Sequence, residues 1–272
     1  MTAEHPARLD YRPVGHPGGQ AAPSSQSDRF AARPTLLFCG GFHSNMRGNK
    51  AEFLDRYCRE QGLAFTRFDY RGHGETPGET AAFGIADWLD DTLEVLDSLP
   101  DEVLLIGSSL GAWLACLAAA ERPDKIVGLL LLAAAADFTE ELLWPTLDAA
   151  QRAAIDAGRT VRVANAYDDD GWYLKQRLFD SGRKLRVLGK HAARLERIRC
   201  PVRLVHGTAD TDVPWSLSAR LLDAMPHDDV RLLLVKGGDH RLSDTASLGI
   251  IGNEIRGILA ALSGEPEERN RS

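Results

Sequence analysis

Short apolar runs recur along the chain and are separated by longer segments of mixed polarity. The runs are four to seven residues long and rich in Leu, Val and Ile, which is typical of strands buried on both faces of a sheet. They occupy residues 35–39, 64–68, 103–106, 126–132, 202–205 and 230–235. A further short strand is predicted at residues 9–11, before a loop rich in Pro and Gly at 13–34.

Segments with helical periodicity lie between most of these runs. They cover residues 48–61, 85–99, 110–121 and 216–224, and a last amphipathic run covers 248–262. Strands that alternate with helices of this length predict βαβ units and a mainly parallel sheet. Right-handed crossovers then place helices on both faces. The predicted class is α/β, with a sheet of about 7–8 strands flanked by helices.

One interval interrupts this alternation. Residues 137–199 contain no strong strand run, although they include Trp144 and Trp172. We predict that this interval is a helical cap inserted into a single domain of residues 1–272, above the carboxyl ends of the strands. Because aromatic side chains are common in ligand pockets, both tryptophans are candidate substrate-binding residues.

The composition is that of an ordinary globular protein. The 272 residues include 32 basic and 39 acidic side chains, which gives a formal charge of −7, and 44% of them are hydrophobic. A wholly disordered chain would be less apolar. A protein that coats nucleic acid needs a surplus of Lys and Arg, so the sequence predicts no nucleic-acid partner.

The cysteines and the longest apolar stretch indicate the cellular setting. The four cysteines lie far apart with no CxxC pair, so we expect neither a disulfide framework nor a metal site. The longest apolar stretch, 126–136, has 11 residues and is too short to span a bilayer. The N-terminus has no apolar core of a secretory signal. We therefore expect a cytoplasmic protein without a transmembrane segment, and the sequence leaves its oligomeric state open.

The sharpest local motif is Gly107-Ser108-Ser109-Leu110-Gly111, which fits the pattern G-x-S-x-G with Ser109 at its centre. A turn that lifts a serine hydroxyl from the end of a strand needs small residues two positions away on each side, because larger side chains would collide. A predicted strand precedes the motif and a predicted helix follows it. This context favours Ser109 as a nucleophile.

A serine hydroxyl needs a base to remove its proton and an acid to orient that base. His240 is the predicted base, because it lies in a Gly-rich loop after the last predicted strand. Asp210, after the preceding strand, is the predicted acid. Asp212 in the same loop and Asp137 after an earlier strand are alternatives, with loop-capping and N-cap roles as their structural interpretations. His206, beside a glycine turn, is assigned a structural role.

Acyl chemistry also needs two N–H donors for the oxyanion that forms during attack. One predicted donor is the backbone N–H of Leu110, directly after the nucleophile. The other is the N–H of Phe42, in a glycine loop that allows the backbone to approach the substrate closely. Gly41 and His43 beside it are further candidates for substrate binding.

The chain order Ser109, Asp210, His240 matches that of the α/β-hydrolases. Over nearly its whole length the chain resembles this superfamily. Within it, the chain is similar to the branch of mitochondrial palmitoyl-protein thioesterases that also act as acyl-glucuronide esterases, and to their bacterial relatives. The matching segments are residues 67–72, 107–114, 206–215 and 239–241.

The resemblance implies hydrolysis of a carboxylic ester or thioester through an acyl-enzyme on Ser109, with no cofactor. The implied substrate is a small acyl ester or thioester, and an acylated protein is a second option. The same three residues also serve C–C bond hydrolases and peptidases. A ligand receptor without turnover is the alternative outside enzymes.

A basic segment lies at the end of the predicted cap. Residues 183–199 carry seven Lys or Arg and one Glu, against the acidic average of the chain. The segment is either the solvated face of a helix or a surface that attracts an anionic part of the substrate.

Overall fold

The molecule is built around a seven-stranded sheet, with the order β1-β3-β2-β4-β5-β8-β9. The computed structural model describes residues 8–12, 33–100, 102–165 and 169–263. All neighbouring strands of this sheet are parallel except β1 and β3. The prediction of an α/β fold with a mainly parallel sheet is confirmed. The strands are β1 (Arg8–Arg12), β2 (Thr35–Cys39), β3 (Phe65–Asp69), β4 (Val103–Ser108), β5 (Ile126–Leu132), β8 (Val202–Gly207) and β9 (Val230–Val235).

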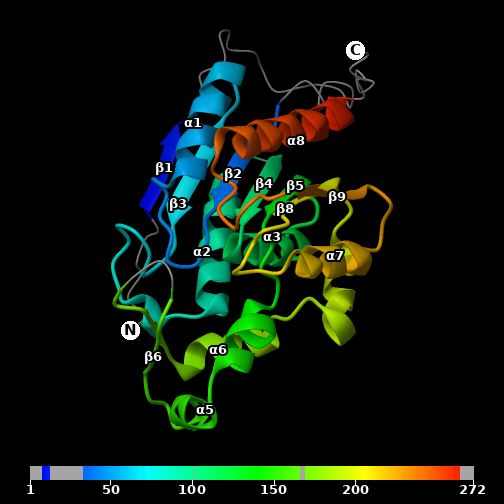
Figure 1. The fold of residues 1–272 in the computed structure, drawn as a ribbon. Coiled ribbons are helices and arrows are strands. Elements are labelled where there is room, and N and C mark those ends of the chain that lie inside the picture. The colour runs from blue at the N-terminus through cyan, green and yellow to red at the C-terminus, as the bar shows by residue number, and fades with distance from the viewer. Residues whose placement is uncertain (1–7, 13–32, 101, 166–168, 264–272) are drawn as a thin grey trace.

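Helices cover both faces of the sheet (Figure 1). Helices α1 (Asn49–Gln61) and α8 (Thr245–Ser263) pack on one face, and α2 (Ile85–Ser98), α3 (Leu110–Glu121) and α7 (Trp215–Ala224) on the other. Strands β2, β3, β4 and β8 are buried at every position because of this double cover. Helix α3 is buried from its first residue almost to its last, since it lies between β4 and helix α2.

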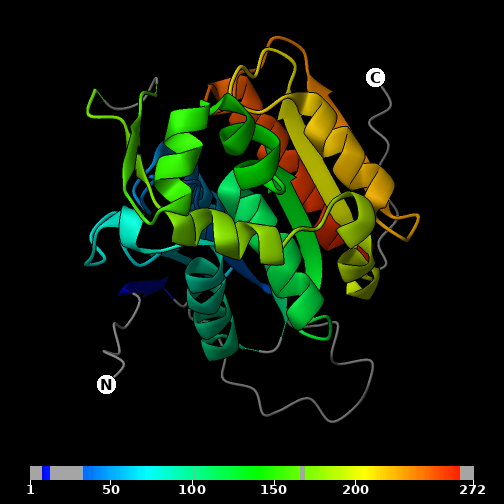
Figure 2. The same cartoon turned by 90° about the horizontal axis from the view of Figure 1, so that it is seen from below.

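The segment between β5 and β8, which we call the cap segment, gathers at one end of the sheet (lower part of Figure 1, front of Figure 2). It includes an antiparallel strand pair as well as helices, so it is not wholly helical as predicted. Each strand has three residues, and Arg162 alternates with valines, which leaves no apolar run to detect. Its elements are η3 (Thr139–Leu143), α4 (Trp144–Thr146), α5 (Ala149–Asp156), β6 (Val161–Val163), β7 (Trp172–Leu174), α6 (Gln176–Lys184) and η4 (Gly189–Arg197).

Two other predictions concern the beginning of the chain and its relation to membranes. The short strand expected at 9–11 is present as β1, paired antiparallel with β3. Most of the loop expected at 13–34 lies outside the described residues. Within the described ranges, no helix is both long enough and apolar enough to cross a bilayer.

Parallel strands end at the same edge of a sheet, and this places the candidate residues together. Loops that follow β2, β4, β5, β8 and β9 all start at that edge. Every residue that the sequence singled out for catalysis lies in one of these loops or directly after it. Ligand sites of open α/β sheets lie outside the carboxyl ends of the strands for this reason.

Candidate active site

Ser109 occupies the sharp turn between β4 and α3. Its backbone has φ 56° and ψ −116°, and a positive φ is uncommon for a residue with a side chain. A Cβ added at Gly107 would lie 2.4 Å from the Gly111 carbonyl oxygen, and one at Gly111 would lie 2.1 Å from the Cys39 carbonyl oxygen. Both positions therefore require glycine, and the turn holds Ser109 at the wall of a cavity.

Three side chains from separate loops form a continuous hydrogen-bonded chain. Ser109 Oγ lies 3.1 Å from His240 Nε2, and His240 Nδ1 lies 2.8 Å from Asp210 Oδ2. Because a carboxylate only accepts hydrogen bonds, His240 Nδ1 carries the proton. The lone pair of His240 Nε2 then faces the serine hydroxyl, which is the arrangement of a general base beside a nucleophile.

The Asp210 carboxylate is completely enclosed. Its Oδ1 accepts the N–H groups of Asp212 and Val213 at 2.9 and 2.8 Å, and its Oδ2 accepts from His206 at 3.0 Å in addition to His240. Burial alone would raise the pKa of Asp210, but these hydrogen bonds, first those from the two histidines, hold it well below its usual range. The acid is therefore ionised throughout the neutral range.

The loops after β8 and β9 are joined through the main chain. The Thr208 N–H donates to the Val235 carbonyl at 2.9 Å, and the Ala209 N–H donates to the Gly238 carbonyl at 3.0 Å. A Cβ at Gly207 would lie 2.1 Å from that same Gly238 oxygen. The backbones that carry Asp210 and His240 are thus in direct contact, which fixes the separation of the two side chains.

Phe42 and Leu110, the predicted oxyanion donors, line the same cavity as Ser109. Neither backbone N–H has an acceptor among the described residues. A Cβ at Gly41 would lie 3.4 Å from the Ser109 Cβ, so the loop after β2 passes directly beside the nucleophile. Two unused donors next to a serine are what an oxyanion site requires.

The cavity has a volume of about 480 Å³ and is lined by chain segments of two kinds. Apolar side chains come from the cap segment and from the loop after β2. Polar side chains come from that same loop, from the start of α1 and from the loop after β9. The apolar set includes Phe42, Phe138, Leu142, Leu143 and Trp172. The polar set includes Asn45, Asn49, Lys50 and Arg241.

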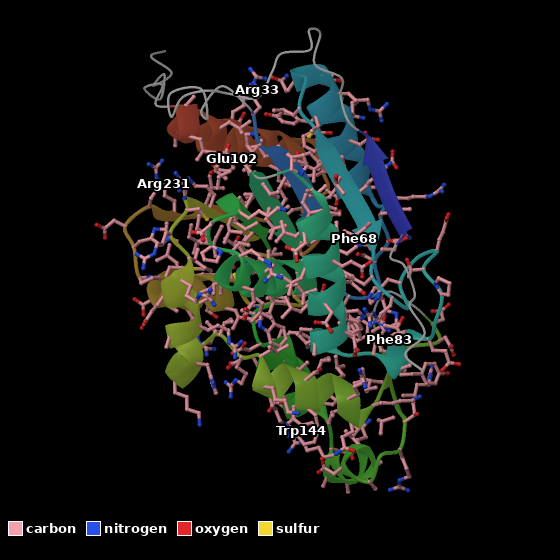
Figure 3. The ribbon with its side chains drawn as sticks, turned by 180° about the vertical axis from the view of Figure 1, so that it is seen from behind. Arg33, Phe68, Phe83, Glu102, Trp144 and Arg231 are labelled. Atoms are coloured by element: carbon pink, nitrogen blue, oxygen red, sulfur yellow. The ribbon has the colours of Figure 1, made fainter. Side chains whose placement is uncertain are left out.

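Of the four residues predicted to bind substrate, Gly41, His43 and Trp172 line this cavity. The rings of His43 and Trp172 stack, with centroids 5.9 Å apart and planes 10° apart. Trp144 lies inside the cap segment, at the lower end of the molecule in Figure 3, with the Arg183 guanidinium 4.4 Å from its ring centroid. Trp144 is half-buried, its ring packs against that of Phe179, and it is not among the residues that line this cavity.

The two alternative acids have other partners. Asp212 has an exposed position at the cavity wall, and its backbone N–H donates to Asp210. Asp137 is fully buried, and its carboxylate accepts the N–H groups of Val187 and Leu188 at 2.8 and 3.1 Å. Since those amides lie about fifty positions away, Asp137 holds the far end of the cap segment and is not a local helix cap.

Two residues near the chain of Ser109, His240 and Asp210 were missed or assigned a lesser role from the sequence. His206 donates to the Asp210 carboxylate, and the only signal in the sequence is its spacing of four residues from Asp210. Lys50 lines the cavity and donates to the backbone carbonyl of Arg241, next to His240. Burial lowers the pKa of Lys50 to about 8, although nearby Asp239 opposes the shift.

Asp210, Asp212 and His240 each offer a ligand atom within 4.8 Å of the others, a spacing that also suits a metal ion. Two of these atoms already share the 2.8 Å hydrogen bond between acid and base. The remaining nitrogen of His240 faces Ser109. We therefore assign this cluster to the acid–base chain.

The parallel sheet, the strained serine turn and the order of the three loops define an α/β-hydrolase. Residues 31–244 match the Hydrolase_4 family, described as serine aminopeptidase, S33, and the chain belongs to this family. It is 33% identical over 233 residues to the rat mitochondrial palmitoyl-protein thioesterase ABHD10, covering 85% of this chain and 76% of that protein.

Solved structures also match this chain. A crystal structure of a protein from Agrobacterium vitis S4 matches with a TM-score of 0.78 and 33% identity, covering 93% of this chain and 99% of that one. Mouse ABHD10 has a TM-score of 0.74 and 31% identity, covering 84% and 90%. The resemblance found in the sequence is confirmed, and the chain is a hydrolase enzyme.

Proposed function

We propose that this chain is a serine hydrolase that cleaves carboxylic esters or thioesters through an acyl-enzyme on Ser109. The observation that carries the proposal is the unbroken hydrogen-bonded chain from Ser109 through His240 to Asp210 at the wall of the cavity. The names of the mammalian relatives support acyl chemistry, since they are palmitoyl-protein thioesterases.

The cycle follows from the observed hydrogen bonds. As Ser109 Oγ attacks the acyl carbonyl, His240 Nε2 takes the hydroxyl proton, and the Asp210 carboxylate stabilises the imidazolium that forms. His240 then gives this proton to the departing alcohol or thiol, which leaves an ester on Ser109. Water, activated by the same histidine, releases the carboxylic acid and restores the serine. The cycle needs only this chain and water.

The oxyanion is held by the backbone N–H groups of Phe42 and Leu110. Losing one donor of this kind costs about 3–4 kcal/mol of transition-state stabilisation. Leu110 is also the first residue of α3, so the positive end of the helix dipole adds to the stabilisation. Both donors belong to main chain held by close glycine contacts, and they are therefore in place before the substrate arrives.

The lining of the cavity indicates the type of substrate. Apolar residues of the cap segment, among them Phe138, Leu142 and Trp172, favour a hydrocarbon acyl group. The polar residues Asn45, Asn49 and Arg241 favour a hydrophilic leaving group. This combination fits an acyl thioester or ester with a polar alcohol or thiol part, either as a small molecule or on a protein.

A serine-directed probe tests the nucleophile. We expect a fluorophosphonate to label the wild-type chain and to leave Ser109→Ala unlabelled. Ser263→Ala, which removes an exposed serine at the end of α8, is the matched control and should label fully. Labelling of Ser109→Ala at the wild-type rate would refute the assignment.

A substrate panel tests the reaction. It contains p-nitrophenyl esters and acyl thioesters of increasing chain length, an S-acylated peptide and an aminoacyl p-nitroanilide. We expect Ser109-dependent turnover of the acyl compounds. Turnover of the anilide alone would favour the peptidase alternative, and serine labelling without any turnover would favour a receptor.

A further inference from the structure

The acid of the triad binds two histidines on one oxygen. Asp210 Oδ2 lies 2.8 Å from His240 Nδ1 and 3.0 Å from His206 Nε2. His206 is on β8 and its side chain is 0% exposed, so it meets neither solvent nor substrate. The cycle described above uses His240 alone, and the second imidazole has no part in it.

The partners of His206 determine which of its nitrogens carries the proton. Nε2 lies 3.0 Å from the Asp210 carboxylate and 3.0 Å from the Val213 carbonyl, and both of these groups only accept hydrogen bonds. Nε2 must therefore be protonated. Nδ1 lies 2.7 Å from the hydroxyl of Ser218, a buried residue of α7 that can donate to it. Every polar atom of the ring is satisfied in the neutral Nε2–H form.

We propose that His206 is a positioning residue for the reaction: it shares Asp210 Oδ2 with His240, fixes the carboxylate and limits how basic the catalytic histidine becomes. The inference rests on the proposed function. A carboxylate oxygen that already accepts one N–H has less charge density for a second donor. Without His206, the Asp210 charge would act on His240 alone and favour its protonated form more strongly.

The geometry also explains how the carboxylate is held. The N–H groups of Asp212 and Val213 bind Oδ1, and the two imidazoles bind Oδ2. Removing the His206 donor leaves Oδ2 bound only by His240, whose loop is partly open to solvent. The carboxylate can then turn, and small errors in the placement of a catalytic group reduce rates by about 10- to 100-fold.

Other charged groups lie near this site. Lys50 on α1 interacts electrostatically with Asp239 and Asp210. Asp212 and Arg241 belong to the loops after β8 and β9. Burial lowers the pKa of Lys50 to about 8, so its titration falls on the basic side of a rate profile. The acidic limb of the kcat/KM profile is therefore the measurement that reports on the Asp210 and His240 pair.

Two substitutions at His206 test the roles of its two ring nitrogens separately. In His206→Gln the amide nitrogen takes the place of Nε2 and keeps a donor for Asp210. In His206→Asn the amide lies near the Nδ1 position, faces Ser218 and leaves Asp210 without that donor. Ser218→Ala is the matched control, because it removes a buried hydrogen bond of His206 and leaves both contacts of Nε2 in place.

For His206→Asn we expect the acidic limb of kcat/KM to move to higher pH by about 0.5–1 unit. We expect kcat to fall about 10- to 100-fold with little change in KM, because the misplaced group acts in the chemical step. His206→Gln should restore the wild-type limb and most of kcat. Ser218→Ala should lower Tm while its limb stays at the wild-type pH.

Rates are normalised to the active fraction, determined by titration with a fluorophosphonate, so that misfolded protein does not count. The inference would be overturned if the acidic limb of the kcat/KM profile of His206→Asn lay at the same pH as in the wild type. It would also be overturned if Ser218→Ala shifted this limb as far as His206→Asn does. If Ser109→Ala keeps full turnover, the proposed function itself fails. Turnover that depends on Ser109, with an unmoved limb in His206→Asn, refutes only the role of His206.

A measurement on the wild-type protein needs no variant to fold. Long-range ¹H–¹⁵N correlation spectra of histidine-labelled protein at pH 7.5 distinguish the two tautomers of each ring. We expect the signals of His206 to show the Nε2–H form. The Nδ1–H form would overturn the inference, because Asp210 would then receive no proton from this ring.

Discussion

The loops after β5 and β8 each place one buried aspartate at the same edge of the sheet, and the two carboxylates have different partners. Asp210 accepts two imidazole N–H groups and two amides of its own loop. Asp137 accepts two amides from the far end of the cap segment and pairs with Arg186. One carboxylate therefore belongs to the proposed acid–base chain, and the other holds the cap segment in place.

The pKa shifts of the two groups have opposite signs. Burial raises the pKa of Asp137, and its hydrogen bonds and Arg186 offset only part of the shift. Burial acts in the same direction on Asp210, but the two histidines reverse it and hold the pKa low. Equal burial at equivalent places of the fold thus does not decide the role of an aspartate; its donors do.

The largest expected effect is that of Asp210→Asn. The asparagine amide cannot hold His240 in the tautomer that faces Ser109, so kcat should fall by about 10⁴-fold with KM within a few-fold of wild type. Steady-state kinetics on a p-nitrophenyl ester measure this. Asp212→Asn is the control and should cost less than about 10-fold. An equal loss in both variants would contradict the choice between the two acids.

Asp137→Ala should affect stability instead. It removes the acceptor of two buried amides and should lower the free energy of unfolding by about 2–4 kcal/mol, as measured by urea denaturation. Asp148→Ala, which removes the N-cap of α5 within the same segment, should cost about 1 kcal/mol. If Asp137→Ala lost activity as severely as Asp210→Asn, with an unchanged unfolding midpoint, Asp137 would have a direct part in catalysis.

The pH dependence of stability should separate the two carboxylates by sign. A raised folded-state pKa favours the protonated form, so the stability contributed by Asp137 is present below its ordinary value of 3.8 and is lost as the pH rises. The contribution of Asp210 is present above 3.8 and is lost as the pH falls.

Comparing wild type with Asp137→Asn and with Asp210→Asn between about pH 3.5 and 6 tests this contrast. Relative to Asp137→Asn, the wild type should lose stability as the pH rises. Relative to Asp210→Asn, it should gain stability over the same range. Two curves that move in the same direction would be inconsistent with the pKa shifts.

The smallest expected effect is that of Arg186→Met. The Arg186 guanidinium lies 3.3 Å from Asp137 and 3.2 Å from Glu141 and is 28% exposed, so its loss should cost about 0.5–1 kcal/mol. We expect KM for anionic and neutral substrates to keep their ratio, because this charge is used inside the protein. Lys190→Met, an exposed lysine of the same basic segment, is the control.

The Arg186→Met variant also tests the two interpretations of the basic segment 183–199. Arg183 pairs with Glu140, Arg186 pairs with Asp137, and the Arg197 guanidinium lies 4.0 Å from Glu121. Residues 183–199 are all described, and none of them lines the cavity. If Arg186→Met raised KM for anionic substrates and not for neutral ones, the interpretation that the segment attracts anionic substrates would be favoured.

The sequence predicted the sheet well because parallel strands covered on both faces are continuous apolar runs. The strands at 35–39, 126–132 and 230–235 begin and end where expected. Helix α8 begins at Thr245, three residues before the predicted amphipathic run, because its first turn carries little apolar signal. The β6–β7 pair was missed because strands of three residues contain too few positions for a pattern.

The site was predictable where the position of a residue follows from a strand end. Ser109, Asp210 and His240 each follow a recognised strand, so the fold brings them together. Trp144 and Trp172 could not be separated in this way, because the path of the cap segment depends on distant contacts such as those of Asp137. The contact between His206 and Asp210 could not be predicted either, because the burial and ring orientation of His206 are set by the folded structure.

The hydrogen bonds of Asp137 also affect how much the cap segment can vary. The chain leaves the sheet at residue 137 and is held by that same side chain at residues 187 and 188, so the excursion between them begins and ends at one point. The entropic cost of closing such a loop grows only slowly with its length, so added residues raise that cost little once the two ends are held together. We therefore expect the segment to tolerate changes in length and sequence without displacing the loops that carry Ser109, Asp210 and His240.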